Sequence, residues 1–195
     1  MLDTKARNIV QPFIGKCAEL FIKAGLSANQ VTVIALLIGL IPSMMLTMGY
    51  SSLMAVLILW ISGLFDAIDG TIARKTHTMS PFGSVMDITF DRLVEISLVL
   101  SIAYRYSNEQ MVFVLLATSI ILSMTIFLTV GAASEKASEK SFYYQPGLAE
   151  RTEGFILFSL MMIFTSYVDL LAIIFSGLIL FTACQRFVEA YKHLR

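Results

Sequence analysis

The sequence predicts an all-α integral membrane protein, with six transmembrane helices preceded by an N-terminal amphipathic interfacial helix. Of the 195 residues, 57% are hydrophobic and only 14% are charged. The mean hydropathy of +0.78 lies well above that of soluble domains. Apolar runs of about 20 residues, the length that crosses a bilayer, recur along the chain. We therefore expect residues 1–195 to form a single membrane domain.

The predicted interfacial helix covers residues 5–24. Its apolar residues recur at helical spacing, and most of its charged residues lie off that stripe. The stripe consists of Ile9, Val10, Phe13, Ile14, Cys17, Leu20 and Phe21. A basic amphipathic helix of this kind favours anionic headgroups in the membrane interface. An ordinary helix that packs on the other helices is the alternative.

Six segments are apolar enough to serve as spans. They lie at about 31–48, 53–73, 82–104, 110–133, 153–168 and 169–190. The fifth is short and is joined to the sixth by the tight turn "SYVD". Both cysteines fall on the side that we assign to the cytosol, so no disulfide is expected.

Basic residues in short connections predict the orientation of the chain. They gather before the first span, after the second, after the fourth and in the tail, whereas the opposite face carries only Arg105. By the positive-inside rule both termini are cytosolic. The net charge is zero, so nucleic acid is not expected as a partner.

Acidic residues form two stripes at the cytosolic end of the second and third spans. At 100° per residue one face of the second span carries Asp66, Asp69, Gly70 and Ala73. On the third span Gly83, Asp87, Asp91 and Glu95 recur every four residues. The short connection "RKTHTMSP" predicts an antiparallel hairpin in which the two stripes face each other.

Such a cluster is costly without cations, because one acidic residue near the middle of a span costs ~3 kcal/mol. Oxygen ligands without His or Cys suit Mg²⁺, Mn²⁺ or Ca²⁺, and paired ions of this kind serve phosphoryl transfer. Arg74 adds a cation where a phosphate could lie, and Arg92 is expected to neutralise Glu95. A cation transporter or channel that uses the same acids is the alternative, and packing is the alternative for the glycines.

Residues 66–91 fit the pattern D-x2-D-G-x2-A-R-x8-G-x3-D-x3-D at every fixed position. The stretch resembles the signature of the CDP-alcohol phosphotransferase family of membrane enzymes. The family's P-N-x-x-T element is kept in part by "SANQVT", which has Asn29 and Thr32 but Ala28 in place of proline. Ser80 also matches a family position near the nucleotide.

The resemblance implies transfer of a phosphatidyl group from a CDP-linked lipid, of the CDP-diacylglycerol type, to an alcohol with release of CMP. It implies that Asp66, Asp69 and Asp87 ligate two ions, Mg²⁺ or Mn²⁺, and that Asp91 ligates one and also acts as the base. It further implies a homodimer in the cell (inner) membrane. The implied CDP-lipid ligands are Asn29, Thr32, Asp69, Gly70, Ala73, Arg74, Ser80 and Gly83.

The acceptor alcohol is left open. Basic candidates for a phosphorylated acceptor are Lys136, Lys140, Arg151 and Arg186, although each is also an ordinary positive-inside residue. In the branch of the family that uses inositol phosphate we expect K-A-R and E-R-x-E-R, and here Ser138 and Gly154 replace two arginines. Glycerol phosphate, inositol phosphate, serine or another alcohol therefore stays possible.

Overall fold

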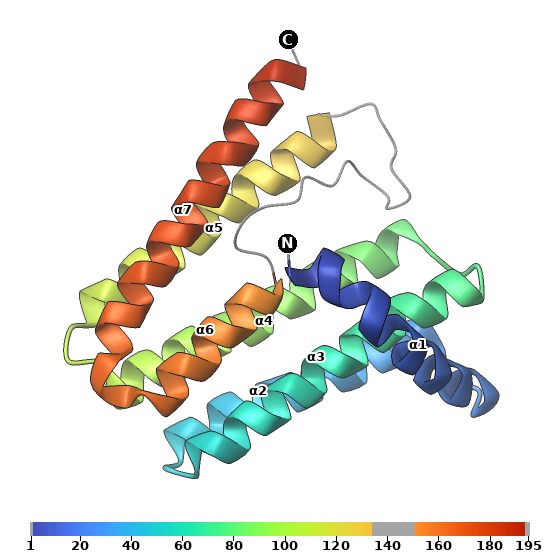
Figure 1. Cartoon of the computed structure of the whole chain (residues 1–195), viewed down its shortest axis with the longest axis horizontal. Helices are drawn as coiled ribbons and strands as arrows, with labels where there is room; N and C mark the ends of the chain where they lie inside the picture. The colour runs from blue at the N-terminus through green and yellow to red at the C-terminus, as the bar shows by residue number, and fades with distance from the viewer. Residues whose placement is uncertain (1, 134–150, 194–195) are drawn as a thin grey trace. The chain divides into compact units, whose positions relative to one another are not determined.

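The computed structural model describes residues 2–133 and 151–193, and every regular element within these ranges is helical (Figure 1). The prediction of an all-α chain is thereby confirmed for the described residues. The helices are α1 (Leu2–Lys23), α2 (Ala28–Thr47), α3 (Ser52–Lys75), α4 (Pro81–Tyr106), α5 (Gln110–Ala133), α6 (Arg151–Ile163), the 3-10 helix η1 (Thr165–Tyr167) and α7 (Val168–His193).

Four helical segments are long and apolar enough to cross a membrane: α2, α3, α5 and Thr165–Lys192. The predicted third span coincides with α4, whose charged residues include Asp87, Asp91, Arg92 and Glu95. The predicted fifth span is shortened to the 13 residues of α6. At 1.5 Å per residue these cover about 20 Å, less than the hydrocarbon thickness of a bilayer. The count of six spans therefore stays a prediction.

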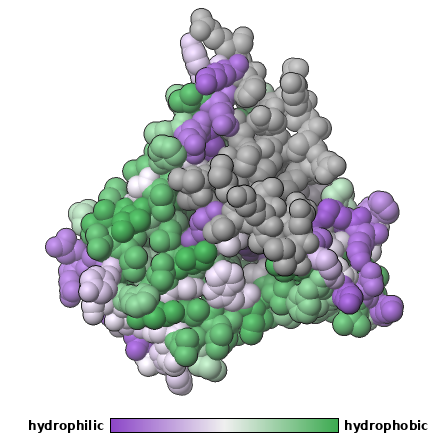
Figure 2. Space-filling view, in the orientation of Figure 1, coloured by the Kyte–Doolittle hydropathy of each residue, from purple (hydrophilic) through white to green (hydrophobic). Residues whose placement is uncertain are grey.

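Large apolar side chains are exposed along the four candidate spans, for example Leu37, Leu57, Ile121 and Phe181. Figure 2 shows broad hydrophobic areas on the face in view. Exposed apolar surface of this extent is unfavourable in water and is typical of a surface that contacts lipid.

The chain divides into two compact units, and each is described by itself. One unit is Thr4–Arg105, with α1 to α4, and the other consists mainly of Tyr106–Arg195. In the latter, α5 packs along α7 and α6 packs on α7. The expectation of a single membrane domain over residues 1–195 stays a prediction.

The apolar residues of α1 are partly buried against α2 and α3 and partly exposed. Ile14 and Ala18 are buried in a cluster with residues of α2 and α3, and the ring of Phe21 meets that of Phe65 edge to face at 5.6 Å. Phe13 and Leu20 are exposed. The inner part of α1 thus follows the packed alternative, whereas its placement in a membrane interface stays a prediction.

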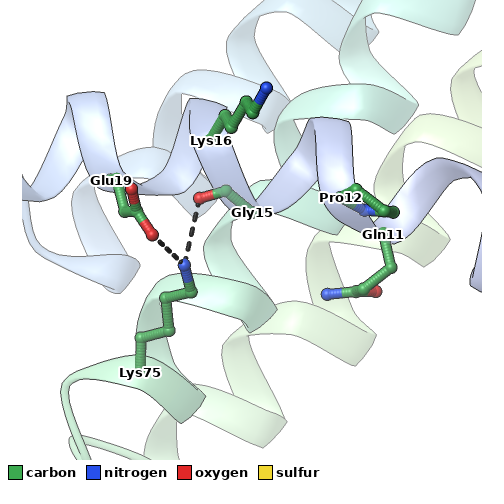
Figure 3. Close-up of a pocket in the computed structure, with 6 residues that line it drawn as sticks. All are labelled: Gln11, Pro12, Gly15, Lys16, Glu19 and Lys75. Carbon is green, nitrogen blue, oxygen red and sulfur yellow. Dashed lines mark hydrogen bonds and ion pairs between the residues drawn. The ribbon is translucent and has the colours of Figure 1, made fainter.

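Lys75, the last residue of α3, bonds to two residues of α1. Its Nζ donates to the carbonyl oxygen of Gly15 at 3.2 Å and to Oε1 of Glu19 at 2.6 Å (Figure 3). The hydrogen bond and the charge of Lys75 lower the pKa of Glu19. These groups line an open groove of about 500 Å³, together with Gln11, Pro12 and Lys16, and Lys16 points away from Lys75.

The first three helices end in the same way. The residue after the C-cap has a positive φ, and the amide of the next residue donates to a carbonyl five residues back, as in a Schellman motif. Gly25 and Gly49 supply that conformation after α1 and α2, and His77 supplies it after α3 with a φ of 55°. Arg105 adds a hydrogen bond to the carbonyl oxygen of Leu46 at the end of α2, where a cation is favourable.

Helix α2 lies very close to α3 and α4 at Gly39. A Cβ added there would lie 2.6 Å from Cγ2 of Val94 and 2.7 Å from Oγ of Ser62. The Ser62 hydroxyl donates to the carbonyl oxygen of Ala35 at 2.8 Å, so it cannot turn away without losing this bond. The lack of a side chain at position 39 therefore sets the spacing of the three helices.

Replacing Gly39 with Ala should lower the free energy of unfolding by about 1–3 kcal/mol, because the new methyl group overpacks this contact. Thermal unfolding in detergent micelles measures the change. Gly177→Ala is the matched control, because nothing lies within 4 Å of a Cβ added at position 177 of α7. Equal stability of the Gly39 variant and the wild type would contradict the close approach.

Replacing Lys75 with Met should raise the pKa of Glu19 toward its ordinary value of 4.5. Because the folded-state pKa is lowered, the ion pair favours the folded state above about pH 4.5, and this contribution is lost as the pH falls through the folded-state pKa. A ¹³C NMR titration of the Glu19 carboxyl group measures the shift. Lys16→Met, which removes a weaker influence on Glu19, should change it less.

Candidate metal and nucleotide site

The α3–α4 hairpin brings the predicted acidic stripes together. Helix α3 ends at Lys75, residues 76–80 form the turn, and α4 begins at Pro81. Figure 1 shows the two helices running in opposite directions from this turn. The predicted antiparallel hairpin is confirmed.

Three of the four aspartates converge between the helices. Asp66 and Asp69 of α3 and Asp87 of α4 each place one carboxylate oxygen within 4.8 Å of the other two. Asp69 is only 5% exposed, and the other two are half-buried. Asp91 is not part of this group and lies one turn further along α4, where it is also half-buried.

Three carboxylates at this spacing repel one another, and partial burial between helices strengthens the repulsion. A divalent cation among them would reverse the sign of the interaction. The set consists of hard oxygen donors, which suits Mg²⁺ or Mn²⁺ and not the softer metals that prefer thiolates. The donor chemistry of this group therefore fits a divalent metal.

The first turns of α2 and α4 meet beside Gly83. Ser80 caps α4: its Oγ accepts a hydrogen bond from the backbone N–H of Gly83 at 3.0 Å, and Pro81 occupies the first helical position. A Cβ added at Gly83 would lie 3.1 Å from Oγ of Ser80 and 3.4 Å from Oδ1 of Asn29. Three residues that the resemblance implies for the nucleotide are therefore neighbours.

The start of α2 explains why Ala28 can replace the proline of the family element. Ser27 is the N-cap, and it forms a capping box with Gln30. Ala28 is thus the first helical residue, a position that both proline and alanine favour. Asn29 is exposed on this turn, whereas Thr32 is 6% exposed and donates its hydroxyl to the carbonyl oxygen of Ala28 at 3.0 Å.

Arg74 lies over Gly70, one helical turn after the acidic pair on α3. A Cβ at position 70 would lie 3.3 Å from Nη1 of Arg74, and Nη2 donates to the hydroxyl of Thr71 at 3.0 Å. Ala73 is half-buried beside it. The family pattern does not specify the residue at position 71, so it did not predict the hydrogen bond between Thr71 and Arg74. The only hint in the sequence is that a hydroxyl lies three residues before the arginine.

The remaining charged pair on α4 is structural. Arg92 forms a salt bridge with Glu95, one helical turn away. This confirms the predicted neutralisation of Glu95, and Glu95 is not part of the group formed by Asp66, Asp69 and Asp87.

Two of the four candidate acceptor residues are described, and both contact an aromatic ring. The guanidinium of Arg151 on α6 lies 5.6 Å from the ring centre of Phe155. Arg186 on α7 is only 8% exposed; it lies 5.0 Å from the ring centre of Phe127 and donates to the Ser123 hydroxyl at 3.4 Å. Lys136 and Lys140 lie outside the described residues.

Gly154, which stands where an arginine was expected, is buried in α6. A Cβ there would lie 3.5 Å from the ring of Phe175 on α7. The same ring packs edge to face on Phe158 at 5.3 Å. Position 154 is therefore part of the α6–α7 contact.

Comparison with known proteins gives a consistent result. The sequence model of the family described as CDP-alcohol phosphatidyltransferase matches residues 26–185. The chain is 26% identical to the inner membrane protein YnjF of Escherichia coli, over 100% of this chain and 98% of that one. It is 29% identical to the archaetidylinositol phosphate synthase of Pyrococcus horikoshii, over 98% and 97% of the two chains.

The fold is shared with a solved enzyme, the phosphatidylinositol phosphate synthase of Mycobacterium tuberculosis. Its structure with CDP-DAG bound superimposes with a TM-score of 0.76 at 16% identity, over 91% of this chain and 93% of that one. A second structure of that enzyme, with manganese and citrate, gives a TM-score of 0.74 at 17% identity, over 91% and 88% of the two chains.

Replacing Asp87 with Asn should lower the affinity for Mn²⁺ at least about tenfold, because one charged ligand of the three is lost. Electron paramagnetic resonance of free Mn²⁺, titrated into purified protein, measures the affinity. Asp169→Asn is the matched control, since Asp169 lies in the other unit and accepts a hydrogen bond from Ser107 at 2.7 Å. Unchanged Mn²⁺ binding by the Asp87 variant would rule out a metal at this group.

Proposed function

Because the chain belongs to the CDP-alcohol phosphatidyltransferase family, we propose that it transfers a phosphatidyl group from a lipid of the CDP-diacylglycerol type to an alcohol and releases CMP. The observation that carries the proposal is the convergence of Asp66, Asp69 and Asp87 within one hairpin. A solved enzyme of the same fold binds CDP-DAG. A cytosolic-end site of an inner membrane protein would meet both the water-soluble nucleotide and the lipid tails of such a donor.

The metal ligands in this proposal are Asp66, Asp69, Asp87 and Asp91, which would hold two Mg²⁺ or Mn²⁺ ions. When bound, the ions supply positive charge that neutralises the diphosphate and the departing CMP. The three converging carboxylates give the chain the oxygen donors for this purpose, and Asp91 on the next turn of α4 extends them along the helix.

Asp91 is the proposed base. Its carboxylate accepts the proton of the acceptor hydroxyl while that oxygen forms a bond to the phosphorus that carries the diacylglycerol, and the bond from this phosphorus to the CMP oxygen breaks. Asp91 suits this role because it lies beside the converging carboxylates without being one of them. Asp91 would ligate only one ion, whereas a carboxylate shared between two ions would be a weaker base.

The CDP part of the donor is proposed to lie along the first turns of α2 and α4 and the last turn of α3. Asn29, Ser80 and Gly83 are neighbours there, and the missing side chain at Gly83 lets the Ser80 and Asn29 side chains approach the backbone. Arg74 would contact a phosphate from the side of Gly70. Thr32, Ala73 and Asp69 complete the proposed set.

A phosphorylated polyol is the proposed acceptor, with inositol phosphate as the first candidate and glycerol phosphate as the second. The names of the relatives support this order, since two are synthases of inositol phosphate lipids. Arg186 supports a phosphorylated acceptor, because a buried arginine within a candidate span is more often functional than structural. Arg151, Lys136 and Lys140 are the further candidates. Ser138 and Gly154 stand where the inositol-phosphate branch is expected to have arginines, so this chain has two fewer cations there.

The alternative of a cation transporter or channel has no support in the comparisons. We further propose a homodimer with both termini on the cytosolic side of the cell membrane, as the family resemblance and the basic connections suggest.

Purified protein that is incubated with CDP-diacylglycerol, Mg²⁺ or Mn²⁺ and inositol phosphate should release CMP, measured by chromatography. Chelation of the divalent ions should abolish the release. A panel of glycerol phosphate, serine and unphosphorylated inositol tests the acceptor class. If every acceptor gives no CMP from folded, metal-loaded protein, the proposed reaction is wrong; release with serine alone would overturn only the acceptor.

Replacing Asp91 with Asn should reduce kcat by about 10²–10⁴-fold, because the neutral amide cannot accept the proton. Binding of the CDP-lipid should fall much less, since the three converging carboxylates are kept. Asp169→Asn again serves as the control and should keep wild-type turnover. Wild-type kcat in the Asp91 variant would remove this residue from the base role.

A further inference from the structure

The Thr71 hydroxyl joins three parts of the structure at one point. It donates to the carbonyl oxygen of Ala67 at 2.9 Å, one turn earlier on α3. It accepts from Nη2 of Arg74 at 3.0 Å and from Nε2 of Gln11, on α1, at 3.4 Å. A hydroxyl has one donor and two acceptor sites, so all three are used here.

The bond to Ala67 alone would carry no function. Thr118 and Thr125 on α5 make the same bond to the carbonyl four residues before them. Thr71 differs because two side-chain donors, from two helices, converge on its oxygen. It is also only 3% exposed, so water does not compete for this oxygen.

The bond to Thr71 restricts the side chain of Arg74, which is an exposed residue. An exposed arginine ordinarily samples many rotamers, and fixing it on a ligand costs side-chain entropy. Here Nη2 is held by a buried hydroxyl whose own χ1 is restricted by β-branching and by the bond to Ala67. The other terminal nitrogen, Nη1, lies over Gly70.

We propose that Thr71 is a positioning residue that holds the Arg74 guanidinium over Gly70, ready to bind a phosphate of the nucleotide-linked donor, and that Gln11 ties α1 to the same point. This inference rests on the proposed function for the donor, although Thr71 itself touches no substrate. Helix α1 thereby becomes part of the support of the donor site, in addition to its packing on α2 and α3.

The test uses Thr71→Val, which keeps the shape and the β-branch but removes the hydroxyl. The dissociation constant for CDP-diacylglycerol, measured with Mn²⁺ in nanodiscs, should rise about five- to tenfold, because the Arg74 guanidinium then lacks the hydroxyl that holds Nη2 in place. In turnover assays KM for the CDP-lipid should rise while kcat changes little, as expected when binding in the ground state and transition state falls equally. Thr71→Ser should restore most of the affinity.

Two controls separate positioning from a loss of folding. Thr76→Val removes a hydroxyl that bonds to the Ile72 carbonyl and to Thr78 at the end of the same helix, and it should bind the donor as the wild type does. In an Arg74→Met background, Thr71→Val should cause no further loss of affinity, because the two residues act together.

Equal donor affinity of the Thr71→Val variant and the wild type would overturn the inference, as would an additive loss in the Arg74→Met background. A wild type that binds no CDP-lipid would also overturn it. A wild type that binds CDP-lipid but releases no CMP would refute the proposed reaction, while the affinity series still decides the role of Thr71.

Discussion

Mutual repulsion among Asp66, Asp69 and Asp87 is the constraint on which the rest of the structure depends. One carboxylate oxygen of each lies within 4.8 Å of the other two. Because Asp69 is buried and the other two are half-buried, water screens the like charges only in part. A firmly fixed hairpin keeps them together against this repulsion, and a divalent cation among them would offset it. The tight turn, the αL conformation of His77 and the cap by Ser80 fix the hairpin.

Contacts within the unit Thr4–Arg105 hold this hairpin in place. Gly39 lets α2 approach α3 and α4 closely, and the Ser43 and Ser97 hydroxyls bond across that contact at 2.7 Å. Helix α1 adds contacts through Ile14 and the Lys75–Glu19 pair. Small residues and hydrogen-bonded hydroxyls allow close helix packing here, because neither leaves an unpaired polar group in an apolar region.

The residues proposed for acceptor binding have different surroundings. Arg151 and Arg186 each contact a phenylalanine ring, and the weakly hydrated guanidinium tolerates such an environment better than an ammonium group does. Gly154, by contrast, packs against Phe175. Position 154, where the inositol-phosphate pattern has an arginine, is therefore used for packing between α6 and α7. The proposed acceptor site has fewer cations than that pattern predicts.

The sequence by itself determined the helical class, the approximate helix bounds and the antiparallel hairpin, because hydrophobic runs and spacings of three and four residues are local properties. It also predicted the Arg92–Glu95 pair, which is local. Only the tertiary structure decided that Asp91 stands apart from the other three aspartates, that part of α1 is packed, and that Gln11 and Arg74 share the Thr71 hydroxyl. Those features depend on how residues up to 60 positions apart approach in space, and no spacing along the chain encodes that distance.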